Sequence, residues 1–259
     1  MAFKLGSTDI NQVYLGPTDI KQVYLGSTLV HDTTSSPPPS GITRVQAISW
    51  DASAANAPNP KTASITPTSA SNVIVAFVCI EHNGTTGLDT SIDTGGANVP
   101  TLGGNTMVVG ELANRSRRHA GIYAYHPSST AAQTFSLPVS LRGAAVMLAE
   151  YSGVDTTTIF NANTGISSVS NGDVSPSLTT VDAGGYLVGC ATFTFATTTP
   201  TAVTGTEIGS AGGTGGDAKD IAYIAADIAV ASAGATEGVA FNTTAGGSEV
   251  GVCCELNPA

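Results

Sequence analysis

Beyond position 41, the chain consists of short apolar runs separated by clusters of turn-forming residues. The run Val73–Ile80 is apolar at every position, and most other runs are of strand length and are bounded by Gly, Asn, Pro or Ser. Runs of this length and composition are typical of β-strands. Leu, Glu, Lys and Arg, on which long helices depend, are scarce, and only 11% of the residues are charged. The pattern therefore predicts an all-β fold.

The number and spacing of the runs indicate a two-sheet, jelly-roll-like β-sandwich over residues 42–259. Large and small side chains alternate in Gly121–Tyr125, as in a sheet with one buried face, whereas Val73–Ile80 is apolar on both faces and is expected to be a central strand. We expect a common core in this sandwich, formed by Val75, Phe77, Cys79, Ile122, Val146, Leu148, Leu187 and Phe193.

A ten-residue repeat occupies the start of the chain, residues 1–32. In register it reads FKLGSTDINQ, VYLGPTDIKQ and VYLGSTLVHD. Gly followed by Ser or Pro, Thr and Asp is typical of a turn, so we expect strands such as Ile10–Leu15 and Ile20–Leu25 between the turns. The residues that define the repeat are the candidates for attachment to a partner: Leu5, Gly6, Leu15, Gly16, Tyr24, Leu25 and Gly26.

The repeat segment is too small to bury a hydrophobic core of its own. Its strands must pack on the main domain as a capping meander, on symmetric copies, or on another protein. Val13, Tyr14 and Leu15 place apolar groups on both faces of a strand, which favours a homo-oligomer, a trimer above all, or docking on another protein. Residues 33–41, TTSSPPPSG, form an extended Pro-rich spacer between the segment and the sandwich.

The charge balance and the apolar runs exclude several classes of partner. The net charge is −10 with only nine Lys and Arg residues, which argues against nucleic-acid binding. The apolar runs are too short to cross a membrane as helices, and the N-terminus resembles no secretion signal. Four scattered cysteines are no disulfide scaffold and indicate free thiols. The adjacent Cys253 and Cys254 are expected to point to opposite faces, one to the core and one to a partner or solvent.

No arrangement of side chains in the sequence predicts catalysis or a metal. The four histidines lack the spacing of a zinc site and are expected in solvated loops, although His119 and His126 flank one strand. Asp89 and Asp93 lie among Gly and Thr, which indicates a turn before a calcium site. GSAGGTGGD, residues 209–217, is Gly-rich but lacks the Lys of a phosphate loop and is expected to be a flexible loop. We therefore expect a protein that is not an enzyme and uses no cofactor.

Basic residues gather in one part of this acidic chain. Arg115, Arg117 and Arg118 lie in the sequence NRSRRH, and Arg142 follows in the same domain. Two interpretations stay open for these four arginines: a solvated hairpin, or a contact with an acidic partner or a neighbouring copy.

Two resemblances suggest a role. The repeat built on Leu15-Gly16-Pro17-Thr18 and Leu25-Gly26-Ser27-Thr28 resembles N-terminal repeats of virion proteins in tailed bacteriophages. The stretches Ile122–Tyr125, Ala149–Asp155 and Gly185–Gly189 are similar to β-sandwich modules of phage and bacterial surface proteins.

These resemblances imply a structural virion component, a fibre, spike or tail-tip protein that anchors by its repeats to other virion proteins. The sandwich would meet a host-surface glycan or protein. The alternative is a capsid decoration protein that clamps neighbouring capsid subunits, and a carbohydrate-binding or hydrolytic module is a third class. Fold-level analogy of this kind supports a role and no specific site.

Overall fold

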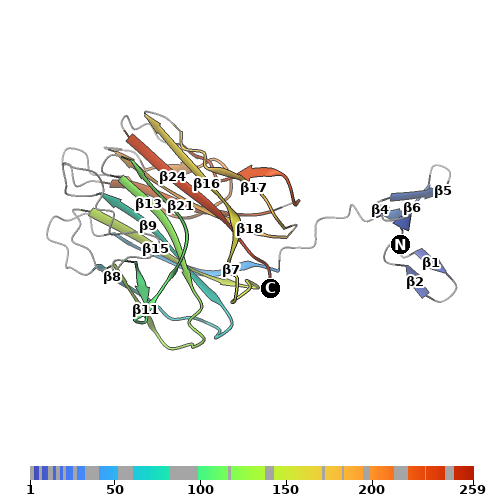
Figure 1. The fold of residues 1–259 in the computed structure, drawn as a ribbon, viewed down its shortest axis with the longest axis horizontal. Helices are drawn as coiled ribbons and strands as arrows, with labels where there is room; N and C mark the ends of the chain where they lie inside the picture. The colour runs from blue at the N-terminus through green and yellow to red at the C-terminus, as the bar shows by residue number, and fades with distance from the viewer. Residues whose placement is uncertain are drawn as a thin grey trace. The chain divides into compact units, whose positions relative to one another are not determined.

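The structure is a computed structural model, and it describes residues 3–5, 8–10, 14–15, 18–19, 22–25, 28–32, 41–51, 61–81, 99–115, 118–137, 143–170, 173–182, 184–194, 199–212, 221–230, 232–242 and 248–259. Every regular element among them is a β-strand (Figure 1). The predicted all-β class is confirmed. The chain divides into two compact units, Met1–Pro39 and Ser40–Ala259.

The described residues of the N-terminal unit form three β-hairpins, one for each ten-residue repeat. They are β1 with β2 (Phe3–Leu5, Thr8–Ile10), β3 with β4 (Tyr14–Leu15, Thr18–Asp19) and β5 with β6 (Gln22–Leu25, Thr28–Asp32). In each hairpin the Leu of the repeat is the partner of its Thr, as in Leu5↔Thr8. Ile10 ends β2 and Tyr14 begins β3, so the expected single strand Ile10–Leu15 is divided between two hairpins.

The first large sheet of the C-terminal unit has five antiparallel strands in the order β12-β13-β9-β15-β7. Their bounds are Val108–Arg115, Arg118–Tyr125, Val73–Glu81, Gly143–Ser152 and Thr43–Asp51. β9 is the middle strand, and Val73–Ile80 is completely buried, as the sequence predicted. A sheet of four shorter strands, β11-β10-β14-β8, belongs to the same half of the chain; they span Asn105–Thr106, Thr101–Leu102, Gln133–Leu137 and Lys61–Ile65.

The second large sheet has the order β16-β24-β18-β21-β20. Its strands are Phe160–Ser170, Ser248–Leu256, Tyr186–Thr194, Ile221–Ala229 and Thr206–Ala211. Two strand pairs accompany it: β17 with β22 (Ser177–Thr179, Thr236–Gly238) and β19 with β23 (Thr201–Ala202, Phe241–Asn242).

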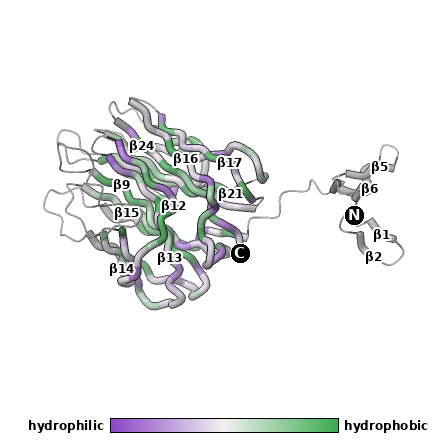
Figure 2. Tube along the Cα trace, viewed as in Figure 1, coloured by the Kyte–Doolittle hydropathy of each residue, from purple (hydrophilic) through white to green (hydrophobic). Residues whose placement is uncertain are grey.

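Three apolar layers hold these sheets together. The central layer lies between the two large sheets and includes Phe77, Ile122, Tyr223 and Val252. A second layer joins the first large sheet to its covering strands, and a third does the same for the second large sheet. In Figure 1 the blue-to-green strands of the first half lie against the yellow-to-red strands of the second, and Figure 2 shows apolar residues running through both. Each large sheet is therefore covered on both faces.

The two halves of the domain, β7 to β15 and β16 to β24, share one topology. The strands of the first large sheet, in the order β12, β13, β9, β15 and β7, correspond to β20, β21, β18, β24 and β16 of the second. Corresponding strands also follow one another in the same order along the chain. In each half the first strand of the large sheet neighbours the last, as in a jelly roll. Corresponding strands also make corresponding contacts with the other half: β12 packs on β24 and β16, and its counterpart β20 packs on β15 and β7. The domain is a pair of jelly-roll-like halves with approximate two-fold symmetry.

The strand registers repeat between the halves as well. Ile74 is opposite Glu150 in the first half, and Leu187 is opposite Glu255 in the second. A β-bulge occurs at the same place in β12, between Val109 and Glu111, and in β20, between Glu207 and Gly209. Since bulges sit at specific positions of a sheet, their recurrence supports the structural equivalence of the halves.

All eight predicted core residues are buried, with at most 1% of their surface exposed. They do not form one core, however. Val75, Phe77, Cys79 and Ile122 belong to the central layer, whereas the other four lie in the two outer layers: Val146 and Leu148 in one, Leu187 and Phe193 in the other. The reason is that β15 and β18 are covered on both faces, so their successive side chains enter different layers.

Replacing Phe193 by Ala should lower the free energy of unfolding by about 3–5 kcal/mol, because it empties a fully buried site in the layer outside the second large sheet. Denaturant unfolding followed by fluorescence measures the change. Val203→Ala, at a position that is 59% exposed, is the matched control and should change the stability by less than about 0.5 kcal/mol. Equal stability of the Phe193→Ala variant and the unsubstituted protein would contradict the layer assignment.

Candidate functional site

The candidate attachment residues of the repeat lie in equivalent places of the three hairpins. Leu5, Leu15 and Leu25 each end the first strand of a hairpin, and Tyr24 precedes Leu25 in β5. Gly6, Gly16 and Gly26 lie outside the described residues. The repeat therefore places a Leu–Thr pair next to the turn of each hairpin.

The arginine cluster is only partly available to a partner. Arg115 and Arg118 face each other across the β12–β13 hairpin, and Arg115 is partly exposed. Arg118 is only 3% exposed, because β13 lies inside the sheet next to β9, so little of its side chain is accessible to a partner. Arg117 and Arg142 lie outside the described residues.

His119 is also buried, against the expectation of a solvated loop. It lies on β13, where its Nδ1 is 2.6 Å from Oδ1 of Asn114 and its Nε2 is 3.2 Å from the Tyr123 hydroxyl. Since Oδ1 only accepts, Nδ1 donates and Nε2 accepts from Tyr123. Gly121, between them on the same face, leaves the room for this contact, because a Cβ there would meet both side chains. Burial lowers the pKa of His119 to about 4, so the ring is neutral in the folded protein.

Two buried glutamates occupy equivalent positions in the two halves. Oε1 of Glu150 accepts from the Thr68 amide at 2.7 Å and from Nδ2 of Asn72 at 2.6 Å, in the turn before β9. Glu255 accepts from the amides of Val181 and Asp182 at 2.7 and 3.1 Å, in the turn before β18. Burial opposes ionisation of Glu150, but hydrogen bonds from Asn72, Gln46 and Thr68 outweigh it and lower its pKa. Each glutamate fastens the turn that leads into the central strand of its half.

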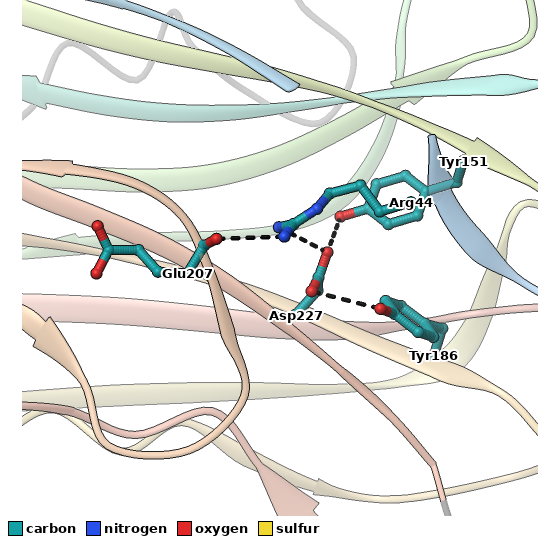
Figure 3. A network of polar contacts seen from close by, with 5 residues as sticks. All are labelled: Arg44, Tyr151, Tyr186, Glu207 and Asp227. Atoms are coloured by element: carbon teal, nitrogen blue, oxygen red, sulfur yellow. Dashed lines mark hydrogen bonds and ion pairs between the residues drawn. The ribbon is translucent and has the colours of Figure 1, made fainter. Parts of the chain in front are cut away.

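A network of polar side chains joins the two halves at one side of the central layer (Figure 3). Asp227 on β21, with its side chain 1% exposed, accepts a hydrogen bond from the Tyr151 hydroxyl on β15 at 2.8 Å. Nη1 of Arg44 on β7 lies 3.1 Å from Oδ2 of the same carboxylate, and the Tyr186 hydroxyl donates to Oδ1 at 3.4 Å. Arg44 also donates through Nη2 to the Glu207 carbonyl at 3.3 Å. First-half and second-half residues thus meet on one carboxylate.

The electrostatics of this network are those of a buried cluster. Burial raises the pKa of Asp227, and the hydrogen bond from Tyr151 and the charge of Arg44 oppose that rise. Burial, with the charge of Asp227, raises the pKa of Tyr186 to about 12. The carboxylate is enclosed, so it is held by its partners and is not presented to a substrate. We interpret the network as a polar clamp between the halves.

The equivalent position on the other side of the domain is apolar. From the strand registers, Phe160 corresponds to Arg44, Leu256 to Tyr151, Val73 to Tyr186 and Ala124 to Asp227. Val73, Ala124 and Leu256 are buried there in the central layer, and Phe160 packs against it. The two halves of the domain therefore offer a comparison, in which equivalent sites hold a polar clamp on one side and apolar side chains on the other.

The cysteines differ from expectation in one respect. Cys253 and Cys254 do point to opposite faces of β24, but both are fully buried, Cys254 in the central layer and Cys253 in an outer one. The expected exposure of one thiol is wrong because strands cover both faces of the second large sheet. Burial raises the pKa of the Cys253 thiol to about 12. All four cysteines are free and buried.

Other candidate sites in the described part of the chain offer little chemistry. A surface pocket of about 410 Å³ lies along β12, lined by Val99 and residues 106–112, with Glu111 as its ionisable side chain. No cluster of three or more metal-ligating side chains occurs among the described residues. Asp89 and Asp93 lie outside them. Residues 209–211, expected in a loop, form the end of β20. No described helix is long and apolar enough to cross a membrane.

Comparison with known proteins gives no relative: no family model, curated protein or solved structure matches the chain.

Asp227→Ala should destabilise the domain by about 3–5 kcal/mol, because Arg44 and two tyrosine hydroxyls lose their buried partner. The combined variant Arg44→Phe, Tyr151→Leu, Tyr186→Val and Asp227→Ala copies the apolar side and should be more stable than Asp227→Ala alone. Denaturant unfolding measures both. A combined variant that is less stable than Asp227→Ala would show that the apolar residues of the equivalent site cannot replace the polar network.

The stability of the domain should fall as the pH is lowered from 6.5 towards 4. The pKa of His119 is lower in the folded state than in the unfolded state, so only the unfolded chain binds the proton in that window. The free energy of unfolding should fall by about 3 kcal/mol in total over this window. In His119→Gln the dependence of stability on pH should largely disappear. His126→Gln, at a partly exposed position, is the control and should keep the slope. An unchanged slope in His119→Gln would show that another group is responsible.

Proposed function

We propose that this chain is a non-enzymatic structural component of a bacteriophage particle, a fibre, spike or tail-tip protein. Its N-terminal repeats anchor it to other virion proteins, and the Pro-rich spacer separates the anchor from a β-domain that meets the host surface or a neighbouring subunit. The observation that carries the proposal is the ten-residue repeat, which recurs as three hairpins that share the Leu–Thr pairing next to the turn.

The size of the hairpins supports an anchoring role. Their strands are two to five residues long, and hairpins of that size are marginal in water without a partner surface. Three copies of one unit at a fixed spacing match a partner that offers several equivalent sites. Binding through linked units gains affinity from effective concentration without requiring strong individual contacts.

The construction of the C-terminal unit supports a structural role for it. Its buried ionisable groups hold turns and halves together: Glu150 and Glu255 fasten two turns, and Asp227 joins the halves. Glu150 and Glu255 each accept several hydrogen bonds, and internal networks of this kind favour a rigid body. A rigid body on a spacer is suited to presenting a surface at a distance from the particle.

Deleting residues 1–32 should abolish incorporation into particles and leave a folded domain, because the anchor is lost and the three apolar layers lie in residues 42–259. Particles assembled with the truncated chain are purified and probed for it by mass spectrometry. A chain with residues 1–32 shuffled at constant composition is the matched control and should also fail to incorporate. Normal incorporation of either chain would refute the anchoring role.

Cryo-electron microscopy of the intact particle separates the proposed role from capsid decoration. Density at the tail or its tip supports a fibre, spike or tail-tip protein. Density repeated over every capsid subunit would replace that role by decoration, and absence of the chain from purified particles would refute both.

A further inference from the structure

The edges of the two large sheets are protected to different degrees. An edge strand presents unpaired amide and carbonyl groups, and proteins usually blunt it with charges, bulges or short length. β7 contains Arg44 and a bulge opposite Glu150 and Tyr151, β12 contains Glu111 and a bulge, and β20 is short with Glu207 and a bulge. These three edges carry the usual protection.

β16 lacks that protection over most of its length. It is an edge of the second large sheet and pairs only with β24 among the described strands. Its sequence, FNANTGISSVS, contains neither an ionisable residue nor a proline. Its one irregularity lies between Phe160 and Thr164, and from Thr164 to Ser170 the register with β24 is continuous. The result is a long, regular and uncharged edge.

An exposed apolar side chain lies within this regular stretch. Ile166 is 55% exposed, although its partner Val252 is fully buried in the central layer. Figure 1 shows β16 beside β24 at the margin of the layered domain. Its neighbours are small: Gly165 is buried under the Ser177 carbonyl, and Ser167 accepts a hydrogen bond from the Ser175 amide. The edge of β16 that faces away from β24 therefore combines backbone groups without a described partner strand, small side chains and one exposed aliphatic side chain.

We propose that β16 is an interface at which a second copy of this chain docks, by antiparallel pairing of β16 with β16. An antiparallel edge is self-complementary about a two-fold axis, because each outward amide of one strand meets a carbonyl of the other. The pairing brings no charges together within the strands, which matters for a chain of net charge −10. It also covers Ile166 in both copies and joins two five-stranded sheets into one.

The equivalence of the two halves of the domain supplies a control for this proposal. β7 is the counterpart of β16 in the first half, and its Val45 is 42% exposed. Both edge strands therefore expose an aliphatic residue. They differ in charge, because β7 carries Arg44 and β16 contains no ionisable residue. Substitution of Val45 tests general effects of a new charge on an edge strand.

Light scattering on the full-length chain tests the proposal. Ile166→Lys should halve the molar mass of the assembly, because a charge on the edge prevents pairing, and its circular dichroism should be unchanged. Val45→Lys should keep the mass of the unsubstituted chain. The factor of two is expected whatever oligomer the N-terminal repeats form. Equal masses for Ile166→Lys and the unsubstituted chain, or an odd number of copies in the latter, would overturn the proposal.

Hydrogen exchange on the unsubstituted chain gives a test that needs no folded variant. The outward amides of residues 164–170 should exchange more slowly as the protein concentration is raised, because the dimer protects them. Amides of β7 should show no such dependence. Protection of β16 that is independent of concentration would contradict pairing between copies, and would point to cover from within the chain.

Discussion

The packing of one five-stranded sheet on the other is the interaction on which the rest of the domain depends. The central layer draws side chains from β9, β13 and β15 on one side and from β18, β21 and β24 on the other. Each sheet carries a further apolar layer on its outer face, so its inner strands have no solvent face. Strands covered on both sides require apolar residues at consecutive positions, which explains the unbroken run Val73–Ile80.

An interior of this kind accepts polar groups only where their partners are fixed. Glu150 and Glu255 take backbone amides that would otherwise be unsatisfied in turns near the core. Asp227 is different, because its partners come from both halves and from strands distant in the sequence. Since the equivalent site is apolar, the clamp distinguishes two otherwise similar sides of the domain.

The same two-fold arrangement determines what the domain presents to its surroundings. The two large sheets face each other, and short strands cover their outer faces. The long strands are therefore accessible only at the edges of the sheets.

The sequence alone determined the class of fold, the central position of Val73–Ile80, the burial of the eight core residues and the repeat at the N-terminus. These features are local: strand length, turn residues and spacing are visible without knowledge of which strands pair. The sequence did not reveal that the domain has two equivalent halves, because few identities accompany the shared topology. The matching positions of Glu150 and Glu255 become apparent only once the registers are known.

Only the tertiary structure decided which faces are covered. One of the two adjacent cysteines, His119 and Arg118 were expected to reach solvent or a partner. All of them are buried, because a sheet or covering layer lies where a simple two-sheet sandwich would have an open face. The meeting of Arg44 with Asp227 likewise depends on the packing of two sheets built from different halves. Such contacts are determined by long-range strand pairing, and alternation along one strand carries no information about what lies across from it.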